Sequence, residues 1–76
     1  MIRYDCHAEF QLARRDIDKA WVERVLSDPH EREDRGDKIS LLACLPERGK
    51  MLRVVVRLND PEYVITAYFD KRKPCA

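Results

Sequence analysis

Two arginines four residues apart, Arg53 and Arg57, have the type and spacing best suited to chemistry on a phosphate. They lie in the apolar stretch 51–58, where alternate residues of a strand face opposite sides of a sheet, so both arginines share one face. Four residues span about 13 Å along a strand, which a polyanion can bridge and a single phosphate cannot. The spacing therefore favours a polyanion as the ligand.

A second predicted strand, residues 63–69, adds a hydroxyl and an aromatic ring to this face. If Ile65, Ala67 and Phe69 face the core, Thr66 and Tyr68 lie beside the two arginines. Arginines can stabilise the pentavalent transition state of a phosphodiester, a hydroxyl can orient it, and a ring can stack on a base. We predict that Arg53, Thr66 and Tyr68 take part in catalysis, and that nucleic acid is bound by Arg57, Lys71, Arg72 and Lys73. The same residues also fit the solvated face of an antiparallel sheet, and that alternative stays open.

His7 is the candidate general base. It falls in the first turn of a predicted helix, where the helix dipole favours the neutral imidazole that a base needs. A capping or half-buried histidine is the alternative. Cys6 and His7 have no second closely spaced pair of ligands elsewhere, so we predict neither a metal nor any other cofactor. Gly36 and Gly49 are the only glycines, which excludes a glycine-rich phosphate loop.

Length and composition limit the class of protein. A chain of 76 residues, 45% of them hydrophobic, supports one domain, residues 1–76, with little stability to spare. The first 37 residues hold 7 basic and 10 acidic side chains and the remainder 8 and 4, so the second half is the basic one. No apolar stretch suits a membrane span or a signal peptide, and we expect a cytoplasmic location without membrane contact. Three widely spaced cysteines then suggest free thiols.

The elements that would position these residues follow from apolar periodicity. Cys6, Phe10, Ala13 and Ile17 form the stripe of a first helix, and Asp18 is the N-cap of a second helix that ends before Pro29. Residues 28–38 form a polar connection, followed by strands at 39–45, 51–58 and 63–69. We predict an α+β fold with two N-terminal helices packed on one face of a three- to four-stranded antiparallel sheet.

Short motifs along most of the chain match this order of elements. They are His7-Ala8, Arg14-Arg15-Asp16-Ile17, Trp21-Val22-Glu23-Arg24-Val25-Leu26, Asp28-Pro29, Leu52-Arg53-Val54-Val55-Val56 and Val64-Ile65-Thr66-Ala67-Tyr68. The set resembles a family of small bacterial proteins known as a domain of unknown function, number four-two-five-eight. That family looks like a branch of the RelE and ParE toxin superfamily, which is grouped with barnase, colicin and EndoU-type nucleases.

The resemblance implies a RelE- or barnase-like fold and a metal-independent ribonuclease, in some members encoded beside an antitoxin. The family's histidine, strand arginine, threonine and aromatic residue match His7, Arg53, Thr66 and Tyr68. Many relatives continue with a threonine-serine-lysine segment and a final tyrosine, whereas this chain has Phe69-Asp70-Lys71-Arg72-Lys73.

These observations leave two main hypotheses of function. In the first, His7 activates a ribose 2′-hydroxyl of RNA, and arginines stabilise the phosphorane that forms. In the second, a non-catalytic module of the same fold binds a protein through its sheet edge or its open face. A third hypothesis is a ParE-like protein that acts on a topoisomerase, which would have the same fold. Pairing at a sheet edge could also produce a homodimer.

Overall fold

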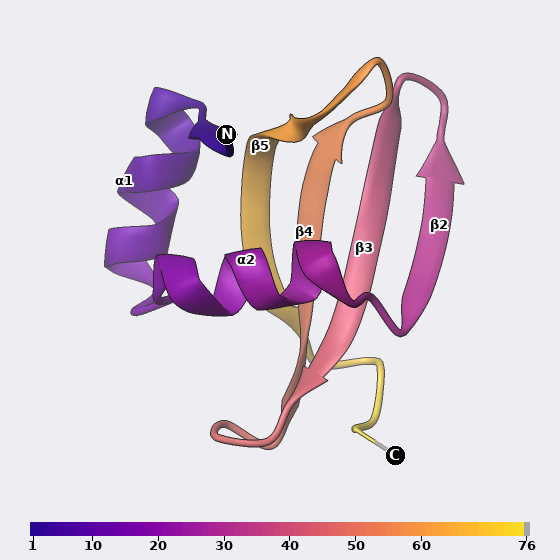
Figure 1. Cartoon of the computed structure of the whole chain (residues 1–76). Coiled ribbons are helices and arrows are strands. Elements are labelled where there is room, and N and C mark those ends of the chain that lie inside the picture. The colour runs from indigo at the N-terminus through magenta and orange to yellow at the C-terminus, as the bar shows by residue number, and fades with distance from the viewer. Residues whose placement is uncertain (76) are drawn as a thin grey trace.

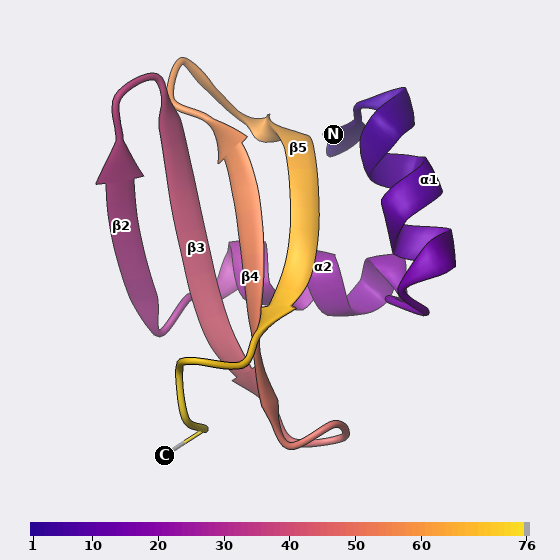
Figure 2. The ribbon, with the colours of Figure 1, turned by 180° about the vertical axis from the view of Figure 1, so that it is seen from behind.

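The computed structural model describes residues 1–75. In chain order, the elements are β1 (Arg3–Tyr4), α1 (Cys6–Arg14), α2 (Lys19–Ser27), β2 (Glu31–Arg35), β3 (Lys38–Leu45), β4 (Lys50–Arg57) and β5 (Asp60–Asp70). The five strands form one sheet in the order β1-β5-β4-β3-β2. Figure 1 shows α2 crossing one face of the sheet and α1 standing beside β5. The opposite face carries no helix, as Figure 2 shows, and we call it the open face.

The predicted three- to four-stranded antiparallel sheet behind two N-terminal helices is wrong. A strand, β1, precedes the helices and pairs in parallel with β5, which makes the five-stranded sheet mixed. A further strand, β2, lies in the segment 28–38 that we expected to be a polar connection. Two residues are too few to show an alternating pattern, and β2 contains only charged residues, so apolar periodicity detects neither strand.

The first helix begins at an N-cap, Asp5, whose side chain accepts a hydrogen bond from the backbone N–H of His7 at 2.9 Å. Its buried residues are Ala8 and Leu12, whereas Phe10 of the predicted apolar stripe is 61% exposed. The predicted buried face of this helix is therefore wrong. Both faces carry apolar residues at helical spacing, and only packing against β5 selects between them.

The second helix agrees with its sequence pattern. Asp18 is its N-cap and accepts from the backbone N–H of Ala20 at 2.8 Å. Val22 and Val25 are buried in the core, and the helix ends at Ser27, two residues before Pro29. Packing of α2 over β3 and β4 closes the hydrophobic core on one side of the sheet.

A β-bulge in β5 determines which side chains reach the open face. Val55 pairs with Thr66 while its neighbour Val56 pairs with Val64, so Ile65 is an extra residue without a partner in β4. Val64 is consequently fully buried in the core, although simple alternation put it on the open face and put Ile65 in the core. Beyond the bulge the expected alternation holds, with Ala67 in the core and Tyr68 opposite Arg53.

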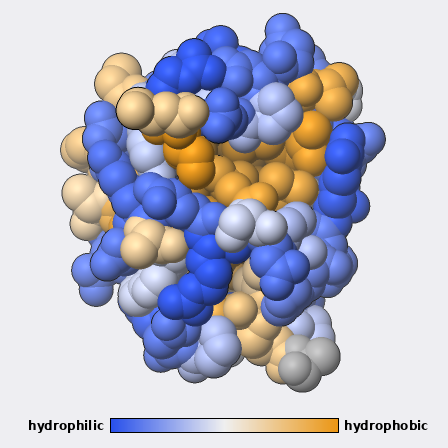
Figure 3. Space-filling view, in the orientation of Figure 1, coloured by the Kyte–Doolittle hydropathy of each residue, from blue (hydrophilic) through white to orange (hydrophobic). Residues whose placement is uncertain are grey.

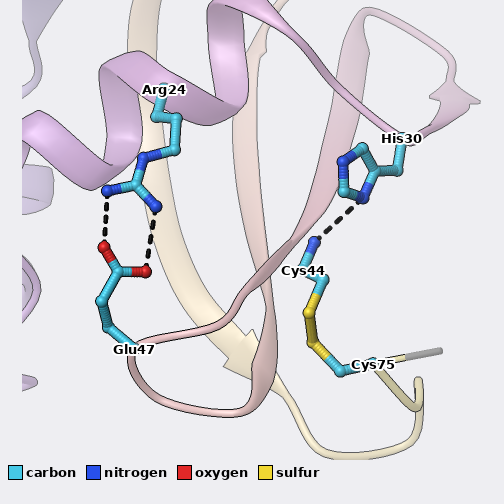
Figure 4. Close-up of a disulfide and its surroundings, with 5 residues drawn as sticks. All are labelled: Arg24, His30, Cys44, Glu47 and Cys75. Atoms are coloured by element: carbon cyan, nitrogen blue, oxygen red, sulfur yellow. Dashed lines mark hydrogen bonds and ion pairs between the residues drawn. A yellow bond between two sulfur atoms is a disulfide. The ribbon is translucent and has the colours of Figure 1, made fainter.

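A disulfide joins Cys44 of β3 to Cys75 near the end of the chain, with 5.2 Å between their Cα atoms (Figure 4). The prediction of three free thiols is wrong for this pair, and only Cys6 is free among the described residues. The bond fixes the segment after β5 across the lower part of the open face (Figure 2). On the other side of the same region, Arg24 of α2 holds the β3–β4 turn through two bonds to Glu47, of 3.0 and 2.7 Å.

The helix side of the molecule has an apolar centre. Figure 3 shows hydrophobic residues gathered in the middle of this side, within a largely hydrophilic surround. A shallow hollow there is lined by Ile2, Glu23, Leu26, Ser27, Leu41, Pro61 and Glu62. Across residues 1–75, neither nine-residue helix has the length and apolar composition required to cross a membrane.

Candidate nucleic-acid interface

Arg53 lies at the centre of the open face and is only 6% exposed. Its Nε and Nη2 atoms donate to one carboxylate oxygen of Asp70, at 3.2 and 2.7 Å, and its Nη1 donates to Glu33 at 3.0 Å. Lys73 from the C-terminal segment adds a contact of 3.3 Å to Glu33. The guanidinium is thus committed to two carboxylates, which leaves little of its donor capacity for a phosphate.

The two carboxylates around Arg53 stay ionised over a wide pH range. Hydrogen bonds from Arg53 and then from Lys73 lower the pKa of Glu33 to about 2. The same guanidinium, with help from the backbone N–H of Arg72, lowers the pKa of Asp70. Arg53 therefore balances charge within a network that joins β2, β4, β5 and the C-terminal segment.

Beside this network lies a hollow of about 230 Å³, which we call the cationic hollow. Its lining residues are Arg35, Lys38, Ser40, Arg53, Val55, Tyr68 and Arg72, a set with four cations and no carboxylate. Within residues 1–75, no carboxylate lies in ion-pair distance of Lys38 or Arg72. Arg35 reaches only Glu33, at 3.3 Å, and is 69% exposed. The hollow is therefore suited to an anion.

An aromatic ring and a hydroxyl border the cationic hollow. Tyr68 is 36% exposed, and the guanidinium of Arg15 lies 5.9 Å from the centre of its ring. Arg15 also donates to the carbonyl oxygen of Ala67 at 2.9 Å. Thr66 donates a short hydrogen bond to the side-chain oxygen of Gln11. Together these contacts hold the end of α1 against β5.

His7 joins this arrangement through Gln11. The residues His7, Gln11 and Arg15 are spaced by four, so they form one stripe on the side of α1 that borders β5. The amide nitrogen of Gln11 lies 2.8 Å from Nε2 of His7. With the amide as donor, Nε2 carries the lone pair, which is the form that accepts a proton. A line of hydrogen bonds thus runs from His7 through Gln11 to Thr66.

The structure brings some of the predicted site residues together and separates others. Thr66 and Tyr68 lie on the open face next to Arg53, and His7 reaches Thr66 through Gln11. Arg57 is in register with Lys38 at the far end of the same face. Lys71 is exposed, Arg72 lines the cationic hollow, and Lys73 pairs with Glu31 and Glu33. The catalytic roles of His7, Arg53, Thr66 and Tyr68 stay predictions.

Three cations of the interface were missed by the sequence reasoning. Arg35 and Lys38 flank the two-residue β2–β3 turn Gly36-Asp37, which the φ of 65° at Gly36 allows, but apolar periodicity does not detect the strand β2. The sequence does carry a signal for Arg15, which lies four residues after Gln11 and eight after His7. Polar residues at i, i+4 and i+8 of an amphipathic helix lie on one side of it, so this spacing predicts that Arg15 lies beside His7 and Gln11.

Lys38 also lines a second hollow, of about 520 Å³, which we call the mixed hollow. Its lining residues are Asp5, Asp37, Lys38, Arg57, Leu58, Asn59, Tyr63 and Ile65. The guanidinium of Arg57 lies 3.8 Å from the centre of the Tyr63 ring, and the Tyr63 hydroxyl donates to Asp5 at 3.0 Å. Both hollows therefore open on the same face and meet at Lys38.

Among the described residues 1–75, no group of three His, Cys, Asp or Glu side chains is arranged to hold a metal ion. A family model described as "Domain of unknown function (DUF4258)" matches residues 4–69, which include both hollows except Arg72. No curated protein and no solved structure matches the chain.

Proposed function

The chain belongs to the DUF4258 family, whose description assigns no activity, and from the geometry of the open face we propose that it binds single-stranded RNA. The observation that carries this proposal is the cationic hollow, in which Lys38, Arg72 and the exposed Arg35 surround Tyr68. The RelE- and ParE-like relationship, an antitoxin partner and a cytoplasmic location belong to the same proposal, as predictions from the sequence.

The phosphate backbone would be held by cations that have no carboxylate of their own. Six of the eleven basic side chains outside the cationic hollow already form ion pairs within residues 1–75, as Arg24 does with Glu47. Among the described residues, Lys38 and Arg72 on the open face have none, so bringing a phosphate to them breaks none of these pairs. Such contacts supply most of the affinity in sequence-independent binding of nucleic acids.

Tyr68 favours a single strand over a duplex. Its partly exposed ring offers a stacking surface, and a base can reach such a ring only when that base is not stacked in a helix. Ser40 and Thr66 add hydroxyls to the same face, which are groups able to bond a ribose 2′-hydroxyl. RNA with unpaired bases is therefore the ligand class that fits best.

Replacing Lys38 or Arg72 with glutamine is expected to weaken RNA binding and to lower the salt dependence of the binding constant by about one unit of slope each. The measurement is fluorescence anisotropy with a single-stranded RNA that carries 2′-O-methyl riboses and so resists cleavage, over a range of salt concentrations. Lys50→Gln is the matched control, because Lys50 forms no ion pair within residues 1–75 and lies beside Phe69, outside the lining of both hollows. Equal slopes for all three variants and the unmodified protein would exclude the open face as the binding site.

We further propose that the bound RNA is cleaved without a metal, with the His7–Gln11–Thr66 line as the supporting observation. The ribose 2′-hydroxyl would displace the Gln11 amide from His7 Nε2, which would take the hydroxyl proton as its oxygen attacks the neighbouring phosphorus. The bond from phosphorus to the 5′-oxygen of the next nucleotide then breaks, the leaving oxygen takes a proton from water to become a 5′-hydroxyl, and a 2′,3′-cyclic phosphate remains. Arg15 is the cation closest to this line, and it would stabilise the phosphorane in the role predicted for Arg53.

His7→Gln is expected to lower RNA cleavage at least about 100-fold, the usual loss when a general base is removed. The assay incubates unmodified single-stranded RNA with the protein in EDTA and analyses the ends of the fragments. His30→Gln serves as the control, because His30 accepts from the backbone N–H of Cys44 at the far end of the sheet. Cleavage that survives His7→Gln would remove His7 from the mechanism, and intact RNA throughout would leave binding as the function.

A protein-binding module is the second candidate, and the apolar hollow on the helix side favours it (Figure 3). Leu26, Leu41 and Pro61 line this hollow together with two carboxylates, Glu23 and Glu62. A partner that presents an apolar side chain next to a basic one would be complementary to it. By contrast, β2 at the edge of the sheet presents only charged side chains, which disfavours pairing with another strand.

A further inference from the structure

The mixed hollow differs in chemistry from the cationic hollow beside it. Its volume of about 520 Å³ falls within the range of about 300 to 1,000 Å³ that is typical of ligand pockets. Two carboxylates, Asp5 and Asp37, line it together with Lys38 and Arg57. Because the two hollows share Lys38, a ligand with a phosphate in one can extend a neighbouring group into the other.

The carboxylates make the mixed hollow unfavourable for a second phosphate. Asp5 is held in its charged form, because the backbone N–H of His7 and the hydroxyl of Tyr63 donate to it and lower its pKa. Within residues 1–75, no donor is bonded to the side chain of Asp37, although its backbone oxygen accepts from Leu58 at 2.9 Å. Free carboxylate oxygens repel a phosphate and attract N–H groups, so this hollow fits the edge of a nucleobase.

A stacking surface lies in the same hollow. The Arg57 guanidinium covers the Tyr63 ring at 3.8 Å from its centre, which fixes both groups. Planar guanidinium groups and aromatic rings are the usual supports on which proteins stack an unpaired base. The mixed hollow therefore combines a stacking group with acceptors for the base edge.

We propose that the mixed hollow is a base pocket selective for guanine, adjoining the phosphate site in the cationic hollow; this inference rests on the proposed RNA binding. Guanine alone among the four bases presents two adjacent N–H donors, at N1 and at the 2-amino group. A single carboxylate accepts such a pair in the bidentate way that it accepts an arginine. Asp37 supplies this carboxylate, and Asn59 and Lys38 supply donors for the guanine O6 atom.

The test compares single-stranded tetranucleotides with 2′-O-methyl riboses that are identical except for one base. We expect the guanine-containing strand to bind about tenfold more tightly than the strand with inosine, which lacks the 2-amino group, or with adenine. Asp37→Asn should abolish this preference, so that the guanine and adenine strands bind with the same affinity. Asp37 lies in the exposed turn before β3, so the exchange of one polar group does not threaten the fold.

Asp34→Asn is the matched control, because Asp34 is an exposed carboxylate of β2 that lines neither hollow. Equal affinity for all three strands, or a guanine preference that survives Asp37→Asn, would overturn the base pocket while the proposed RNA binding stands. If none of the strands binds, the proposed function and the base pocket both fail. A preference that is lost in Asp37→Asn and kept in Asp34→Asn is the result that supports the inference.

Discussion

Cys75→Ser is expected to lower the free energy of unfolding by about 3 to 4 kcal/mol. The Cys44–Cys75 bond closes a span of 31 residues, and closing a loop of this length in the unfolded chain accounts for a stabilisation of that size. Small domains have only about 5 to 15 kcal/mol of stability in total, so the loss is a large fraction of it. The measurement is the urea midpoint of the oxidised protein and of the variant.

Cys6→Ser is the control for this prediction. Cys6 is an exposed free thiol at the start of α1, so its substitution should leave the urea midpoint unchanged. Reduction of the unmodified protein should reproduce the effect of Cys75→Ser. A midpoint that is the same with and without reductant would show that the disulfide contributes nothing to stability. In that case the ion pairs of Lys73 with Glu31 and Glu33 would suffice to hold the C-terminal segment.

Arg53→Met is expected to destabilise the protein by about 3 kcal/mol, the lower end of the range for breaking a buried ion pair. Methionine fills much of the same volume but leaves Asp70, which is 6% exposed, without a counter-charge. Glu33 keeps Lys73 and Arg35 as partners, which limits the loss. The measurement is again chemical denaturation followed by circular dichroism.

Arg35→Gln is the matched control, because it removes the other arginine that contacts Glu33. Arg35 is 69% exposed, and exposed pairs of this kind contribute about 0 to 1 kcal/mol. If Arg53→Met proves as stable as Arg35→Gln, the network does not hold the fold and Arg53 is free to bind ligand. A large loss of stability instead means that loss of activity in an Arg53 variant says nothing about catalysis.

The parts of the fold that the sequence predicts correctly are those with a strong local signal. The N-cap at Asp18 and the run of valines in β4 are examples, because capping and apolar alternation are local properties. The prediction of which face of α1 is buried was wrong, because Ala8 and Phe10 lie on two different apolar stripes of the helix. Only the position of β5 decides which stripe is buried. The strand β2 contains only charged residues and forms through pairing with β3, which no local pattern reports.

Long-range contacts explain what was missed at the candidate site. Thr66 and Tyr68 were placed on the open face by alternation, and they lie there. The bulge at Ile65 could not be predicted, yet it allows Tyr63 to face the mixed hollow. The partners of Arg53 come from β2 and β5, far apart in the chain, so its burial was not visible in a pattern of adjacent residues.

The most direct test of RNA binding on the open face is a titration of the ¹⁵N-labelled protein with a short single-stranded RNA, followed by backbone amide chemical shifts. We predict that the shifts change first at Lys38, Ser40, Tyr68 and Arg72, around the cationic hollow. The chemical shifts of the amides of α2, which lies on the other side of the sheet, should not change (Figure 1). Changes confined to α2 and the apolar hollow, or none at saturating RNA, would contradict the proposed function.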